Sequence, residues 1–170
     1  QARFTPNSLG VTNVWACAGS VNETLIVNVL QGSVESLNLE TNSHDVTADD
    51  AVVLNLTGQD IRGNVFNVNP PKQNWTIPDG SSISVGATII WSPGVMGAQN
   101  ISVQHAGLVA TIQLNVSHGT ATELVIETDS ILMTADDIIE LNLVLRDAAG
   151  NSWPVAGNWS TEQPDAIAWL

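Results

Sequence analysis

An internal repeat of about 87 residues is the feature that most constrains what this chain can fold into. The tetrapeptide Thr-Ala-Asp-Asp occurs at residues 47–50 and again at residues 134–137. When the chain is aligned with itself at that spacing, 14 of the 28 positions from Leu37 to Asn64 are identical without a gap. Self-similarity at a fixed period marks a repeated structural unit. The two tetrapeptides are therefore interpreted as one structural position that occurs twice.

The repeat divides the chain into one whole unit and two partial units. The whole unit runs from residue 33 to residue 119 and predicts a complete domain. Residues 1–32 match only the last part of a unit, so they predict the C-terminal strands of an incomplete domain. Residues 120–170 match only the first part, and they predict the N-terminal strands of another incomplete domain.

The two ends of the sequence fall near the same point of the repeat. Ala168-Trp169-Leu170 resembles Ile89-Ile90-Trp91, and Arg3-Phe4 aligns with the same place. One interpretation is that residues 120–170 of one chain are completed by residues 1–32 of the next chain. Such a head-to-tail contact does not close on itself and gives an open filament. The other interpretation is that the sequence, which begins with Gln1, is an excerpt of a longer covalent array.

Within the whole unit, apolar and polar residues alternate with period 2, which is typical of half-buried strands. The alternating runs lie at residues 37–41, 52–57, 83–89, 101–103 and 109–116. Turn signals such as Gly63-Asn64 and Asp79-Gly80 separate these runs, and no long stretch keeps a helical period. Six or seven strands in about 87 residues predict an all-β fold, namely a β-sandwich.

The turn at Asp147-Ala-Ala-Gly-Asn-Ser-Trp-Pro resembles the Asp-x-x-Gly-Asn-x-x-Pro turn of bacterial immunoglobulin-like domains. These domains are the tandem modules of invasin- and intimin-type adhesins and of many archaeal surface proteins. The resemblance implies immunoglobulin-like β-sandwich repeats on an elongated protein of the cell surface. The first copy departs from the pattern, because Asp60–Asn64 is followed by Val-Phe-Asn rather than by a proline.

The charge of the chain excludes some partners. Only four residues are Lys or Arg, and the formal net charge is −13. A surface with so few cations cannot neutralise phosphates, so we expect no nucleic-acid partner and no binding to anionic lipids. No apolar run approaches the roughly 20 residues of a membrane-spanning helix, so we expect no membrane insertion.

Six Asn-x-Ser/Thr sequons predict N-linked glycans and an extracellular location. They lie at Asn22, Asn55, Asn74, Asn100, Asn115 and Asn158. The alternative is that strands rich in Asn and Thr generate sequons by chance. Cys17 is the only cysteine, and we expect it to be a small buried hydrophobic residue. The alternative is a disulfide between two chains of an exported protein.

No pattern in the sequence indicates catalysis, a cofactor or a metal. Asp49-Asp50 and Asp136-Asp137 lack the spacing of a calcium loop, so we interpret them as turns whose carboxylates accept backbone N–H groups. The three histidines have no partner at metal-ligand spacing, and no nucleophile elbow or phosphate loop occurs. The tryptophans are interpreted as core anchors, with Trp75 equivalent to Trp159, rather than as a sugar-stacking platform.

These observations predict a structural subunit or segment of an extracellular fibre, stalk or surface layer. Its partners would be copies of itself, joined head to tail by strand addition. The alternative is an adhesin or glycan-binding module taken from a longer covalent array.

Overall fold

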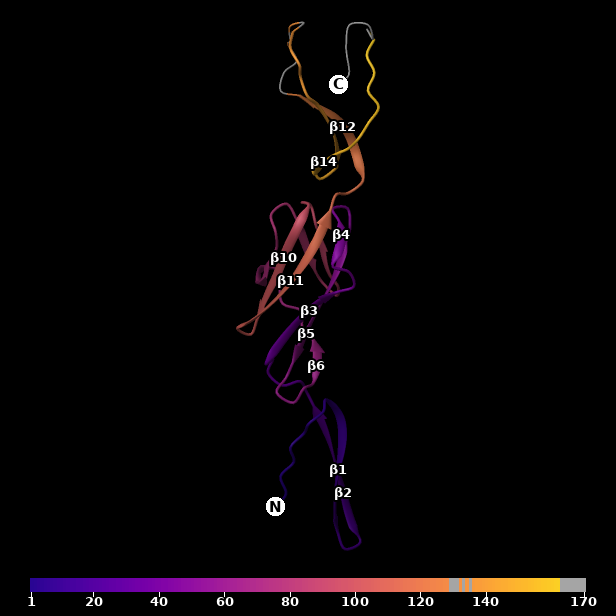
Figure 1. The fold of residues 1–170 in the computed structure, drawn as a ribbon. Helices are drawn as coiled ribbons and strands as arrows, with labels where there is room; N and C mark the ends of the chain where they lie inside the picture. The colour runs from indigo at the N-terminus through magenta and orange to yellow at the C-terminus, as the bar shows by residue number, and fades with distance from the viewer. Residues whose placement is uncertain (129–131, 133, 135, 163–170) are drawn as a thin grey trace.

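The computed structural model describes residues 1–128, 132, 134 and 136–162, and the strands in this part of the chain form antiparallel sheets with one parallel pairing (Figure 1). The N-terminal region is a hairpin of β1 (Gly10–Ala18) and β2 (Val21–Val29), and the C-terminal region is a sheet of β12 (Ala121–Thr128), β13 (Leu141–Asp147) and β14 (Ser152–Pro154). The central region holds β3 (Ser36–Thr41), β4 (Asp45–Thr47), β5 (Val52–Gln59), β6 (Val65–Asn67), the 3-10 turn η1 (Lys72–Asn74), β7 (Trp75–Thr76), β8 (Ser82–Val85), β9 (Ile89–Ser92), β10 (Gly97–His105) and β11 (Leu108–Ser117). The prediction of an all-β fold is confirmed.

The central region is a sandwich of two sheets. One sheet has the strand order β3-β5-β9-β8, with β6 added beside β5, and the other has the order β4-β11-β10-β7. In immunoglobulin lettering these orders correspond to A-B-E-D and to C-F-G, with β4 added as a further strand beside G. The β4 strand pairs with β11 in parallel, whereas the other pairings are antiparallel. The central region therefore has the immunoglobulin-like arrangement that the resemblance implies.

The core of this sandwich is formed by the inward faces of alternating strands. Along β11, buried and exposed residues alternate over the whole strand, as period 2 requires. Trp91 on β9 is 0% exposed and lies at the centre of the core, with Ile101, Val103 and Leu114 also fully buried. The indole N–H of Trp91 has no hydrogen-bond acceptor among the residues that the structure describes. The prediction that tryptophans anchor the core is confirmed for Trp91 and Trp75.

Three sequence-based expectations are wrong in detail. The run from Ile83 to Ile89 is not one strand but the hairpin β8–β9, closed by a tight turn in which Gly86 N donates to Thr88 O. The alternation passes unbroken through this short turn, so the pattern does not reveal it. Cys17 and Trp15 lie on the outward face of β1, and both are exposed rather than buried in a core. No described sheet packs on this hairpin, so even its inward residue Ala16 is exposed.

The N-terminal hairpin reproduces β10–β11 of the sandwich. The pairs Gly10–Val29 and Ala18–Val21 bound its register, and shifting them by 87 residues gives Gly97–Val116 and His105–Leu108, which bound the register of β10–β11. Among the described residues, β1 and β2 pair only with each other. The hairpin thus has the strand register of a sandwich without the opposite sheet.

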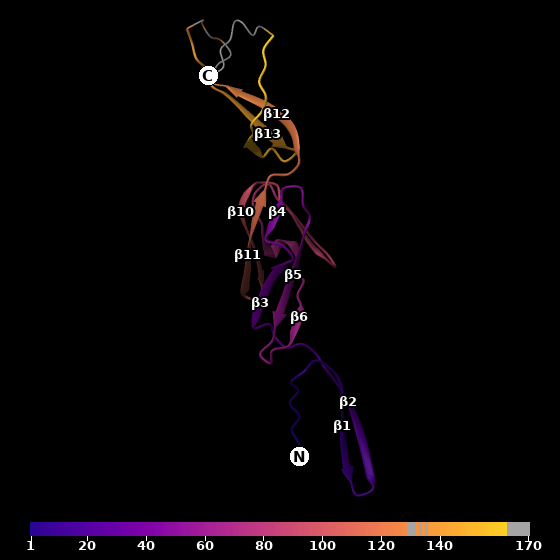
Figure 2. The same cartoon turned by 45° about the vertical axis from the view of Figure 1, so that its right-hand side comes forward.

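The C-terminal sheet reproduces β3, β5 and β6 in the same way. Leu124–Leu145 and Thr128–Leu141 of β12–β13 correspond, after the same shift, to Leu37–Gly58 and Thr41–Leu54 of β3–β5. The pairing of β13 with β14 likewise repeats that of β5 with β6. In both views of the molecule this sheet and the β1–β2 hairpin lie at opposite ends of the central sandwich (Figures 1 and 2).

Candidate functional site

The first candidate site is the inward face of the β1–β2 hairpin, defined by the positions that are buried in β10–β11. These positions hold Val14, Ala16, Leu25, Val27 and Val29, with Phe4 preceding them at the position of Trp91. Leu25 is 63% exposed, although its counterpart Ile112 is 6% exposed. Glu23 is the one polar exception, since its counterpart Ala110 is buried. The face is otherwise apolar and has no sheet packed against it among the described residues.

The second candidate site is the inward face of the β12–β13 sheet. It holds Leu124 and Ile126 on β12, and Leu141, Leu143 and Leu145 on β13. Ile126 is 56% exposed, whereas its counterpart Leu39 is 7% exposed in the central core. In strand register the two candidate sites match the two facing halves of the central sandwich interior. Leu25 and Ile126 are exposed there, and the leucines of β13 are half-buried.

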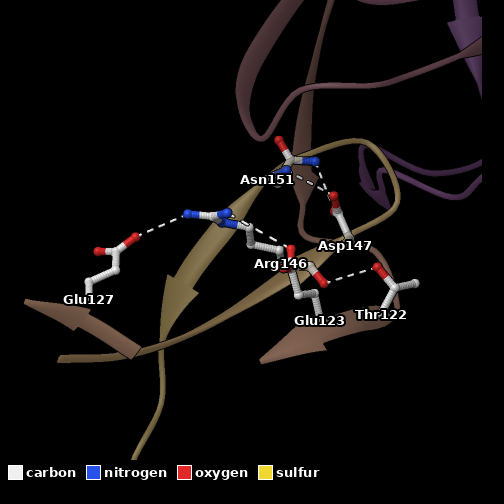
Figure 3. A network of polar contacts seen from close by, with 6 residues as sticks. All are labelled: Thr122, Glu123, Glu127, Arg146, Asp147 and Asn151. Carbon is white, nitrogen blue, oxygen red and sulfur yellow. Dashed lines mark hydrogen bonds and ion pairs between the residues drawn. The ribbon is translucent and has the colours of Figure 1, made fainter. Parts of the chain in front are cut away.

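A third feature is the joint between the central sandwich and the C-terminal sheet. Asp147 at the end of β13 accepts a hydrogen bond from Ala149 N at 3.0 Å. It also accepts from Asn151 N at 2.9 Å and from Asn151 Nδ2 at 2.8 Å (Figure 3). The turn requires a positive φ at Gly150, which is 86°. The same carboxylate accepts a bond of 2.8 Å from Gly119 N, in the linker that leaves β11. The turn thus binds its own sheet to the preceding unit.

The Asn151 side chain extends this joint to the loop before β10. Its Nδ2 donates to Gly94 O at 2.9 Å, and its Oδ1 accepts from Met96 N at 2.9 Å. His118 in the linker stacks on Trp153 of β14, with ring centroids 3.8 Å apart and planes 8° apart. A carboxylate oxygen of Asp49 accepts from Thr120 N at 2.6 Å. These contacts fix the C-terminal sheet against the end of the sandwich.

The joint between the N-terminal hairpin and the central sandwich contains the same bond from a linker glycine N–H to an aspartate carboxylate. Asp60 accepts hydrogen bonds from Arg62 N, from Asn64 N and from Asn64 Nδ2, and its Oδ2 accepts from Gly32 N at 3.3 Å. The prediction that Asp60 and Asp147 form turns before Gly-Asn is confirmed. The sequence did not reveal that each carboxylate also holds the linker from the preceding unit, 28 residues away along the chain.

Hydrogen bonding holds the pKa of both carboxyls below the ordinary value of 3.8. For Asp60 the largest cause is the side-chain amide of Asn64, which outweighs the effect of burial. For Asp147 burial is the largest influence and would raise the pKa, but the bonds from Asn151, Gly119 and Ala149 together lower it. Both carboxyl groups are therefore ionised at neutral pH. In this form they accept the hydrogen bonds of the two joints.

The repeated Thr-Ala-Asp-Asp segments form the predicted turns. Asp50 Oδ2 accepts from Thr47 N at 2.6 Å, and Asp137 Oδ2 accepts from Thr134 N at the same distance. The bond from Thr134 N is the largest cause that lowers the pKa of Asp137. No group of three or more His, Cys, Asp or Glu residues suited to a metal ion occurs in the described part of the chain. Likewise, none of its helices is long and apolar enough to cross a membrane.

The six sequons lie away from the core of the sandwich. Five of the asparagines are exposed, namely Asn22, Asn55, Asn100, Asn115 and Asn158. Asn74 is half-buried, and its Nδ2 donates to Gln104 O at 2.9 Å. The sequons remain a prediction of glycosylation, and the surface positions are the ones that such a modification needs.

No protein-family model matches the chain, and no curated protein matches it. Among solved structures, the chain is similar to domains 4–9 of the surface layer protein SbsC, with a TM-score of 0.40 and 17% identity over 86% of this chain. It is also similar to domains 1–6 of SbsC, with a TM-score of 0.38 and 19% identity over 88% of this chain. The chain spans 25% and 21% of those two structures. At these scores the likeness carries no argument about function, which rests on the geometry described above.

Proposed function

We propose that this chain is a structural segment of an extracellular fibre, stalk or surface layer, in which immunoglobulin-like domains are joined head to tail by strand complementation between copies. The observation that carries the proposal is the paired set of open faces at the two ends of the molecule. One end has the register of β10–β11, and the other has the register of β3, β5 and β6. The β12–β14 sheet of one copy and the β1–β2 hairpin of the next supply opposite halves of one sandwich.

The central sandwich supplies the physical reason for this association. There the same strand positions exclude water from Leu39, Ile112 and Trp91. At the ends, their counterparts Ile126, Leu25 and Phe4 stay largely exposed. Fully burying one such side chain contributes about 1.5–3 kcal/mol, and a lone two-stranded hairpin is marginally stable in water. Closing the sandwich between copies would bury all of these side chains at once.

The extracellular location is part of the proposal. The sequons on outward surfaces, the lack of counter-charge for nucleic acid and the resemblance to surface-protein modules support it. The two hydrogen-bonded joints support a structural role, because they hold successive units to one another.

The second candidate function is an adhesin or glycan-binding module within a longer covalent array. The observation that favours it is Trp15, which is 68% exposed on the outward face of β1. An exposed indole ring can stack on a sugar. Glycan binding that is lost in Trp15→Ala, in a chain that stays monomeric, would support this candidate instead.

The test of complementation compares two adjacent residues on opposite faces of β2. Leu25 lies on the inward face, whereas Ile26 lies at the position of the exposed Gln113 and is 70% exposed. We expect Leu25→Asp to keep the chain monomeric and Ile26→Asp to assemble as the unmodified chain does. Light scattering and electron microscopy report assembly. Equal behaviour of the two variants would overturn the proposal.

A further inference from the structure

The pairing of β5 with β9 provides a template for the seam between two copies. In the central sandwich, Val52 faces Trp91, Val53 faces Ile90 and Leu54 faces Ile89. Shifting the β5 residues by 87 gives Ile139, Glu140 and Leu141, and shifting the β9 residues gives Phe4, Arg3 and Ala2. The inward pairs remain apolar in this alignment, as Ile139 with Phe4 and Leu141 with Ala2.

The outward pair of the template is apolar, but its counterpart at the seam is charged. Val53 and Ile90 are both apolar, whereas their counterparts Glu140 and Arg3 carry opposite charges. Arg3 is one of only four cationic residues in a chain with 17 acidic residues. Both side chains are exposed, and neither forms an ion pair with any described residue of its own chain.

The point at which β13 begins indicates that it lacks the neighbouring strand that β9 provides for β5. The strand begins at Leu141, although its counterpart β5 begins at Val52, two positions earlier in the repeat. In the central sandwich Val52 and Val53 are held in the strand by their pairing with β9. Among the described residues, no strand takes this place beside Ile139 and Glu140, and both lie outside the strand.

We propose that the partner strand is the segment Ala2–Phe4 of a second copy of this chain, and that Arg3 of one copy forms an ion pair with Glu140 of the other. The inference rests on the proposed function, and it adds the residues that select register and partner. Because side chains alternate across a strand, a slip by one residue would direct Arg3 toward the apolar interior and Phe4 toward solvent. The pair therefore favours the register in which Phe4 fills the position of Trp91.

A charge exchange tests this pair. We expect Arg3→Glu and Glu140→Arg, made singly, each to raise the concentration needed for assembly about 3- to 10-fold at low ionic strength, since like charges then face each other. The double variant Arg3→Glu/Glu140→Arg should assemble within about 2-fold of the unmodified chain. About 1 M NaCl should reduce all of these differences, because an exposed pair is screened.

A matched control replaces an exposed glutamate outside the seam. Arg3→Glu/Glu35→Arg restores the same net charge as the double variant, but Glu35 lies in the chain entering β3. We expect it to assemble as poorly as Arg3→Glu alone. If the unmodified chain polymerises and Leu25→Asp blocks it, but the exchange fails to restore assembly or the control restores it equally, the pair is wrong while complementation stands. If the unmodified chain never polymerises, both proposals fail.

Discussion

The hairpins β10–β11 and β1–β2 have the same register and opposite environments. In β10–β11 the inward residues Ile101, Ile112 and Leu114 are buried against the second sheet. In β1–β2 the matching residues are exposed or half-buried, and the strands nevertheless pair position for position as their counterparts do. The comparison teaches that turn chemistry and alternation set the register of these hairpins, whereas burial depends on which strands lie opposite.

Removing residues 1–32 has the largest expected effect on this comparison. The truncated chain lacks the hairpin that would complete another copy, so we expect loss of ordered polymers and irregular aggregation through the open β12–β13 face. The central sandwich should still unfold cooperatively, because its core contains no residue of the removed segment. Electron microscopy and thermal unfolding report the two properties separately. Ordered fibres from the truncated chain would contradict the proposed role of the hairpin.

The second prediction concerns Trp91 and Phe4, which occupy one repeat position in two environments. Trp91→Ala should lower the free energy of unfolding of the central sandwich by about 3–5 kcal/mol, because it empties the centre of the core. Phe4→Ala should leave that unfolding unchanged and weaken assembly. Calorimetry of monomers and light scattering of polymers measure the two effects.

Trp91→Phe is the matched control for this position. It should cost less than Trp91→Ala, because phenylalanine fills most of the space. It also removes an indole N–H that has no acceptor in the described part of the chain. If Phe4→Ala destabilises the central sandwich as strongly as Trp91→Ala, the two environments do not differ as described.

The third prediction compares the two joints through their carboxylates. Because hydrogen bonds lower the pKa of Asp60 and Asp147, their contribution is fully present above the ordinary value of 3.8 and is lost as pH falls through the lower folded-state pKa. Thermal unfolding should therefore be insensitive to these groups between pH 7 and pH 5. Asp60→Asn should lower the unfolding midpoint by several degrees at pH 7 and by less at pH 2. Asp79→Asn, at an exposed turn, should have no such effect.

The smallest expected effect concerns the equivalent sequons Asn74 and Asn158. Repeat equivalence predicts that both are glycosylated or both are bare. The structure sharpens this comparison, because Asn74 Nδ2 already donates to Gln104 O, whereas Asn158 is exposed. Peptide mapping of monomers and polymers measures occupancy at each site. Full occupancy of one site with none at the other would contradict equivalence at this loop.

The repeat and the period-2 pattern predicted the sandwich, most strands and the acidic turns, because these depend on local sequence. They did not predict the β8–β9 turn, since the alternation of side chains continues through residues 86–88. The predictions that Trp15 and Cys17 are buried were also wrong, because composition does not show which strands have a second sheet packed against them. The segment Ala168–Leu170, which was aligned with Ile89–Trp91, lies outside the described residues.

The parallel pairing of β4 with β11 has a mechanical consequence. These strands belong to the first and last parts of the unit, so a pull along the chain slides them past each other and loads their hydrogen bonds in shear. In a unit shared between copies, the equivalent pairing would carry tension from one molecule to the next without a covalent bond. The tensile lifetime of such a fibre would then be set by the rate at which the shared unit opens under force.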